Sequence, residues 1–110
     1  MESEFQYRFT KKAEADLDEI VSYIAAELAN PQAAADFVAR LQKIINETRS
    51  FPESGTQVNN EFLPDIGLRK KNVDNYIMYY LPIFEEKTIY IVRIIYGKRN
   101  TDEILHNLDL

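Results

Sequence analysis

The sequence predicts an α+β fold in which an antiparallel helical hairpin covers one face of a twisted antiparallel sheet, in the order β-α-α-β-β-β. Residues 75–83 and 89–96 are rich in Ile, Tyr and Val and flank a polar break, as is typical of a long β-hairpin. Two apolar stripes with helical spacing precede them. The length of 110 residues, with 45% hydrophobic and 28% charged side chains, fits one globular domain, residues 1–110.

The N-terminal region predicts a short strand followed by a helix. Residues 5–9 alternate apolar and polar side chains, and Thr10 is a candidate N-cap for the helix. Apolar residues then recur in one helical stripe: Ala13, Leu17, Ile20, Ile24 and Leu28. This helix is expected to end before Asn30-Pro31, because a residue that precedes proline avoids the α region.

A second helix is expected to begin near Pro31, or with Asn30 as its cap, and to close around Ser50. Its apolar stripe contains Ala34, Phe37, Val38, Leu41, Ile44, Ile45 and Thr48. Because the connection between the helices is short, they must form an antiparallel hairpin. Their shared apolar face supplies a cover for the sheet.

The C-terminal half is expected to supply most of the sheet. Residues 52–66 are expected to form a loop with little regular structure, and residues 68–73 a strand that pairs with residues 75–83. Pro82 indicates a bulge or an edge position within that strand. Asn100 or Thr101 is a candidate cap for a short C-terminal helix through Leu105.

Strict alternation in the last strand predicts two apolar faces, which both need cover. Ile89, Ile91 and Ile95 share one face with Arg93, and the opposite face carries Tyr90, Val92, Ile94 and Tyr96. An arginine among isoleucines needs a carboxylate partner or a solvent-filled groove around its head group.

The composition excludes several classes of site. The chain has no cysteine, which excludes disulfides and thiolate metal sites, and its histidine, His106, stands alone. Neither a zinc-like ligand spacing nor a glycine-rich phosphate loop is present. We therefore expect no metal and no cofactor. No apolar run approaches the roughly 18 residues that a membrane span requires, so a soluble, cytoplasmic protein is expected.

Charge is distributed unevenly along the chain. Residues 1–66 carry 6 Lys/Arg against 12 Asp/Glu, whereas residues 67–100 carry 7 against 3. The candidate binding patch consists of the cations in and after the predicted strands: Arg69, Lys70, Lys71, Arg93, Lys98 and Arg99. Such a patch can hold a phosphate group, pair with an acidic protein surface, or form a solvated basic edge.

Four segments carry a resemblance to a known family. They are Thr10 to Ile24, Phe51-Pro52, Gly67-Leu68-Arg69 and Tyr96-Gly97-Lys98-Arg99. With them the chain resembles the plasmid-stabilisation toxins of the RelE/ParE superfamily over nearly its whole length. The resemblance implies a helical hairpin on an antiparallel sheet, growth arrest, and control by an antitoxin partner of type II toxin–antitoxin systems. That antitoxin is expected to dock an amphipathic helix or strand on the sheet face or in a groove between helices.

The superfamily contains two mechanisms. ParE-like members inhibit DNA gyrase and are not nucleases, whereas RelE-like members are endoribonucleases that cut messenger RNA on the ribosome. By resemblance, Lys70 and Arg99 fall where RelE-like members carry basic catalytic residues, with His106 as a substitute for a C-terminal tyrosine. The chain departs from that pattern at Ile77, where an arginine is expected, and at Leu105, the tyrosine position.

The ParE-like function is the one that the sequence favours. A net charge of −5 is unfavourable for a ribosome binder, because the ribosome is a polyanion. The long, alanine-rich hairpin also resembles the ParE branch. A third possibility is an inactive or orphan toxin that only binds its antitoxin, and toxicity on induced expression would separate it from the other two.

Overall fold

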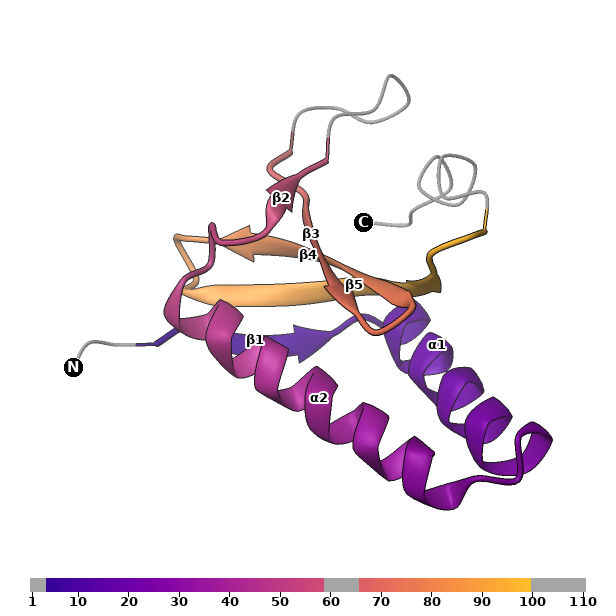
Figure 1. The fold of residues 1–110 in the computed structure, drawn as a ribbon. Coiled ribbons are helices and arrows are strands. Elements are labelled where there is room, and N and C mark those ends of the chain that lie inside the picture. Colours follow the sequence, from indigo (N-terminus) through magenta and orange to yellow (C-terminus); the bar gives the residue numbers. More distant parts are fainter. Residues whose placement is uncertain (1–3, 59–65, 100–110) are drawn as a thin grey trace.

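The computed structural model describes residues 4–58 and 66–99 and confirms the predicted α+β class (Figure 1). The elements, in chain order, are β1 (Gln6–Phe9), α1 (Lys11–Ser22), the π-helix η1 (Tyr23–Glu27), α2 (Pro31–Ser50), β2 (Thr56–Gln57), β3 (Arg69–Val73), β4 (Tyr76–Ile83) and β5 (Thr88–Tyr96). The strands form one sheet in the order β1-β5-β4-β3-β2. Both helices lie on the same side of this sheet, as Figure 1 shows. The predicted C-terminal helix lies outside the described residues.

The starts of both helices are fixed by the residues that the sequence predicted. Thr10 Oγ1 accepts a hydrogen bond from the Ala13 amide at 3.2 Å, and Asn30 Oδ1 accepts one from the Ala33 amide at 3.1 Å. Each bond satisfies an amide that the first helical turn leaves unpaired. Because α2 ends at Ser50, the second helix agrees with its predicted boundaries.

The π-helix η1 was not predicted. In it the Leu28 amide donates to the Tyr23 carbonyl at 3.2 Å, a separation of five residues where an α-helix has four. Ala29, which follows the C-cap residue Leu28, has a φ of 50°. The apolar spacing from Ile24 to Leu28 is compatible with an ordinary α-helix, so the sequence pattern carried no signal for the wider turn.

Two features of the sheet correct the predictions. First, β1 pairs parallel with β5, as in the pair Tyr7↔Ile89, whereas the other pairs are antiparallel. The chain between β1 and β5 passes through both helices and through β2, β3 and β4, which gives the long connection that a parallel pair requires. Second, the loop after α2 contributes a short strand that was not predicted, because β2 pairs with β3 through Thr56↔Lys70. A strand of two residues is too short to show a sequence pattern.

A β-bulge also corrects the predicted faces of β5. Tyr79 pairs with Arg93 but Tyr80 pairs with Ile91, which leaves Val92 as an extra residue. The alternation therefore shifts at Val92, so that Ile94 joins the core under the helices and Ile95 joins the cluster on the opposite face.

The position of Pro82 agrees with one of the two predicted alternatives. The bulge lies elsewhere in β4, between Tyr79 and Tyr80. The pairs between β3 and β4 end at Tyr80, so Pro82 lies beyond the end of β3 and pairs only with β5. The missing amide of proline costs no ladder hydrogen bond at such an edge.

Both faces of the sheet are buried at their centre, as predicted. The core under the helices includes Phe37, Leu41, Ile45, Met78, Tyr80, Ile89 and Ile91. The opposite face carries a second cluster, formed by Leu68, Tyr79, Val92 and Ile95, each with 2% of its surface exposed or less. Burial on both faces explains why β4 and β5 read as continuous apolar runs instead of alternating ones.

The carboxylate of Asp16 joins α1 to β5 next to the bulge. It accepts hydrogen bonds from Arg93 Nε at 2.7 Å, from Arg93 Nη2 at 2.9 Å and from the Ile94 amide at 2.9 Å. Only 11% of the Asp16 side chain and 15% of the Arg93 side chain are exposed. The hydrogen bond to Asp16 raises the pKa of Arg93. The interpretation that the Arg93 head group pairs with a carboxylate is thus confirmed.

Asp16→Ala is expected to destabilise the protein by about 3 kcal/mol, because it leaves the largely buried Arg93 guanidinium and the Ile94 amide without their acceptor. Urea unfolding measures this change. Asp18→Ala, at an exposed position on the same helix, serves as the matched control and should change stability by less than about 0.5 kcal/mol. Equal effects of the two substitutions would contradict the role assigned to Asp16.

Candidate functional site

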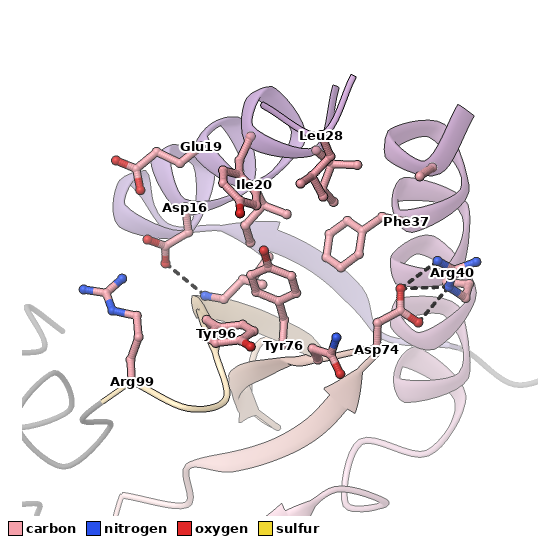
Figure 2. Close-up of a pocket in the computed structure, with 15 residues that line it drawn as sticks. Asp16, Glu19, Ile20, Leu28, Phe37, Arg40, Asp74, Tyr76, Tyr96 and Arg99 are labelled. Carbon is pink, nitrogen blue, oxygen red and sulfur yellow. Dashed lines mark hydrogen bonds and ion pairs between the residues drawn. The ribbon is translucent and has the colours of Figure 1, made fainter. Parts of the chain in front are cut away.

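A groove of about 840 Å³ lies between the helices and the ends of the central strands (Figure 2). One wall consists of α1, η1 and the N-terminal half of α2. The other is formed by the turn between β3 and β4, the start of β4 and the end of β5. The side chains that carry its chemistry are Asp16, Glu19, Tyr23, Leu28, Phe37, Arg40, Asp74, Tyr76, Tyr96 and Arg99.

The floor of the groove is aromatic. The Tyr76 ring contacts Phe37 and Tyr96 edge-on, with centroid distances of 5.3 and 5.6 Å. Burial raises the pKa of Tyr76, with smaller contributions from Tyr23 and Tyr96, so its hydroxyl stays protonated at neutral pH. At the rim Tyr23 and Leu28 are 51% and 55% exposed. Apolar side chains that are exposed beside an apolar floor are typical of a binding surface.

Charged residues stand at both ends of the groove, as Figure 2 shows. At one end Arg40 donates from Nε to Asp74 Oδ1 at 2.8 Å and from Nη2 to Asp74 Oδ2 at 2.7 Å. This bidentate pair connects α2 to the β3–β4 turn, although its exposure limits its contribution to stability. At the other end Glu19 and Asp16 project from α1, and Arg99 lies across from them beyond β5.

The structure does not bring the predicted cationic patch together. Arg69 donates from Nη1 to the carbonyls of Glu53 and Gly55, at 3.0 and 2.7 Å, and thereby holds the chain after α2. Arg93 is held by Asp16. The fold thus engages the guanidinium groups of both arginines.

The lysines of the predicted patch also separate. Lys71 pairs with Met78 on the helix-covered face, where burial lowers its pKa. Lys70 pairs with Tyr79 on the opposite face, because neighbours in a strand point to opposite sides. Lys98 and Arg99 are exposed after β5, and of the six cations only Arg99 lines the groove.

Of the remaining positions of the nuclease-like set, Ile77 alone falls within the described residues. Ile77 lies in β4 and packs against the second apolar cluster. Leu105 and His106 lie outside the described residues. Between residues 4 and 58 and between 66 and 99, no group of His, Asp or Glu is arranged to hold a metal ion. Within the same ranges, no helix has the length and apolar character to cross a membrane.

Sequence reasoning missed most of the groove. Asp16 carried a signal, because it follows Ala13 by three residues and precedes Ile20 by four, which places a carboxylate on the buried stripe of α1. Tyr23 gave no comparable signal, because its position on the rim depends on η1. The groove is built by residues from both halves of the chain, which no local pattern connects.

Comparisons with known proteins agree with this fold. Residues 7–101 match a family model described as the ParE toxin of the type II toxin-antitoxin system parDE. No protein of curated function matches the chain.

Two solved structures are similar to the chain. The first is described as a chromosomal ParDE toxin–antitoxin system from P. aeruginosa, with a TM-score of 0.67 and 23% identity over 86% of this chain and 97% of that one. The second is the RelBE2 toxin–antitoxin complex from Mycobacterium tuberculosis, with a TM-score of 0.62 and 20% identity over 87% and 94%. At these identities the likeness shows the fold.

Arg69→Ala is expected to lower the free energy of unfolding by about 1–2 kcal/mol, because the carbonyls of Glu53 and Gly55 lose a charged donor. Arg99→Ala, at an exposed position, should change it by less than about 0.5 kcal/mol. Chemical denaturation of both variants checks this difference. If Arg69→Ala instead leaves the free energy of unfolding unchanged, the guanidinium of Arg69 is not needed for stability and is available for a functional role.

Proposed function

The chain belongs to the ParE toxin family of type II toxin–antitoxin systems, within the RelE/ParE superfamily, and on this premise we propose that it arrests growth by inhibiting DNA gyrase. The family match covers residues 7–101 and thus nearly all of the chain. The proposal implies action in the cytoplasm, where gyrase meets DNA.

The observation that carries this proposal is the dispersal of the cations. An endoribonuclease needs donors that converge on one phosphate, so that they stabilise the charge formed during cleavage. Here the guanidinium groups of Arg69 and Arg93 are engaged within the fold, and Lys70 and Lys71 point to opposite faces. Such an arrangement favours a toxin that binds a protein target over one that cleaves RNA.

The apolar residue Ile77 supports the same conclusion. By resemblance to RelE-like nucleases, an arginine is expected at this position, but Ile77 packs beside Tyr79 and Ile95. A charged head group at this position would have to leave the cluster to reach solvent. The RelE-like function as an endoribonuclease that acts on the ribosome and mRNA remains the alternative, with Lys70, Arg99 and His106 as its candidate catalytic residues.

We further propose that a cognate antitoxin binds this chain and suppresses its toxicity. The two similar solved structures are described as toxin–antitoxin systems or complexes, and the groove supplies exposed apolar surface suited to such a partner. Tyr23, Leu28 and Tyr96 at its rim are at least 39% exposed, and a partner would bury them. If the chain only binds an antitoxin and has no activity of its own, its expression alone will leave growth unchanged.

Pulse labelling after induced expression without antitoxin tests the proposal. Gyrase inhibition is expected to stop thymidine incorporation within minutes, before methionine incorporation declines. The reason is that replication depends directly on the activity of gyrase and therefore stops first. Purified toxin should then reduce the supercoiling of relaxed plasmid by gyrase at micromolar concentration, and coexpression of the cognate antitoxin should restore growth.

The opposite order of events would reject gyrase as the target. If methionine incorporation collapses first and mRNA is cut on ribosomes, the protein is a RelE-like nuclease. In that case His106→Ala and Lys70→Ala should reduce cleavage. Cells that grow normally while the folded chain accumulates would identify an inactive toxin.

A further inference from the structure

We infer that the end of the molecule opposite the groove binds the protein target of the toxin, with Phe51 and Phe84 as anchors that enter an apolar pocket of that target. Figure 1 shows the start of β1, the turn after α2 and the turn between β4 and β5 at this end, and the connection between the helices at the other. We call this surface the aromatic end, after Phe5, Phe51 and Phe84. The inference rests on the proposed function, because it assigns the aromatic end to gyrase.

The aromatic end exposes two large rings around a buried one. Within residues 4–58 and 66–99, Phe51 is the most exposed large apolar side chain, at 70%, and Phe84 is 52% exposed. Phe5 connects them, because its ring contacts the Phe84 ring edge-on at a centroid distance of 5.2 Å and its amide donates to the Arg49 carbonyl at 3.1 Å. Exposed aromatic rings that lie together are typical of a protein-binding surface.

The backbone of Phe51 is fixed on both sides. Its amide donates to the Glu47 carbonyl at 3.0 Å, and its carbonyl accepts from the Ser54 amide at 2.9 Å and from Ser54 Oγ at 2.6 Å. The chain therefore holds Phe51 in one place while its ring stays in water.

Buried groups anchor the turn that follows Phe51 to the sheet. The hydroxyl of Tyr80, a fully buried residue, donates to the Pro52 carbonyl at 2.9 Å and accepts from the Gly55 amide at 2.8 Å. Arg69 holds the same turn from β3 through the carbonyls of Glu53 and Gly55. A side chain that is already in its binding position loses little conformational entropy on association. The anchored turn thus presents Phe51 as a preorganised contact residue.

The turn between β4 and β5 fixes Phe84 in a similar way. The Glu86 amide donates to the Ile83 carbonyl and the Lys87 amide to the Phe84 carbonyl, both at 3.2 Å. The Gln6 amide donates to the Lys87 carbonyl at 2.8 Å and thereby attaches this turn to β1. The two exposed phenylalanines thus stand on two ordered turns that are both bonded to the start of β1.

The aromatic end is separate from the groove. None of its three phenylalanines lines the groove. Arg40 is the last residue of α2 that does, and it lies about 16 Å from Phe51 along the helix axis. A toxin that meets both an antitoxin and a target needs a surface for each. Because the groove is proposed for the antitoxin, the exposed rings at the other end are assigned to the target.

The charges around the rings favour a basic partner surface. In the segments that form the aromatic end, residues 4–5, 49–55 and 83–87, the exposed charged side chains are Glu4, Glu53, Glu85 and Glu86 against Lys87. Arg49 is partly buried and pairs with Glu4 at 3.6 Å. Gyrase binds DNA, a polyanion, and therefore needs basic side chains on the surface that contacts it. An acidic rim complements such a surface. The expected contact on the target is thus an apolar pocket flanked by basic side chains.

Inhibition of purified gyrase by variants of the toxin tests the anchors. Phe51→Ala and Phe84→Ala are each expected to raise the toxin concentration that halves the supercoiling of relaxed plasmid by about tenfold or more, because each removes an anchor ring. Phe51→Tyr keeps the ring and should stay within about threefold of the wild type. The control is Val38→Ala, an exposed apolar position of α2 outside the aromatic end and the groove, which should stay within about twofold.

Thermal unfolding separates lost contact from lost structure. Phe51→Ala should melt within about 3 °C of the wild type, because the ring is largely exposed. If Phe84→Ala melts earlier because Phe5 loses its cover, Phe84→Leu replaces it and should raise the half-inhibitory concentration about fivefold.

A charge reversal tests the chemistry of the partner surface. Glu53→Lys with Glu85→Lys is expected to raise the half-inhibitory concentration about tenfold. Glu14→Lys with Asp18→Lys changes the net charge equally at exposed positions of α1 and should raise it less than about threefold. Equal effects of the two reversals would reject the basic surface assigned to the target.

The remaining outcomes separate the inference from the proposed function. If the wild type inhibits gyrase and the Phe51 and Phe84 variants inhibit it equally well, or Val38→Ala loses as much as they do, the function stands and the assigned surface is wrong. If the wild type does not inhibit gyrase, the proposed function and the inference both fail. A wild type that sediments as a dimer, with a monomeric Phe51→Ala variant, would show that the aromatic end joins two copies of this chain and would overturn the inference.

Discussion

The three hydrogen bonds accepted by Asp16 are the constraint on which the other features depend. β1 ends at Phe9, so β5 continues beyond its parallel partner and leaves unpaired backbone groups on that side. α1 begins at this point, and Asp16 accepts from the Ile94 amide where a further strand is missing. The same carboxylate neutralises Arg93, whose charge could not be buried alone. One side chain therefore closes the sheet edge and fixes the helix over it.

The position of the groove follows from this attachment. Since α1 is fixed to β5 at its middle, its later turns and η1 extend past the ends of the strands, and α2 returns alongside. Phe37, Tyr76 and Tyr96 fill the base of the space between the layers, while the wider π-turn places Tyr23 and Leu28 at its rim. The groove is thus a consequence of how the hairpin is mounted on the sheet, and its side chains come from elements that are distant in the sequence.

The features that could be predicted from the sequence are those that depend on neighbouring residues. Thr10 and Asn30 cap their helices because capping depends on a few neighbouring residues, and the apolar runs of β4 and β5 reflect burial on both faces. The parallel β1–β5 pair, the bulge at Val92 and the π-turn depend on contacts made after the chain has folded back. The cations of the predicted patch are spread for a simpler reason. Lys70 lies between Arg69 and Lys71 in β3, and successive residues of a strand point to opposite faces, so Lys70 faces away from the other two.

The chain shares its fold with chains from a ParDE and a RelBE2 toxin–antitoxin system, so the layers of the fold alone do not decide the activity. A nuclease needs cations that are free to contact a phosphate. In this fold two guanidinium groups are already engaged, because Arg69 holds a loop and Arg93 holds a helix. A catalytic role for Arg69 or Arg93 would require other residues to secure the loop after α2 and the bulge in β5. Any use of these two arginines to bind RNA would thus be coupled to stability, because the same guanidinium groups cannot be paired within the fold and free to meet RNA.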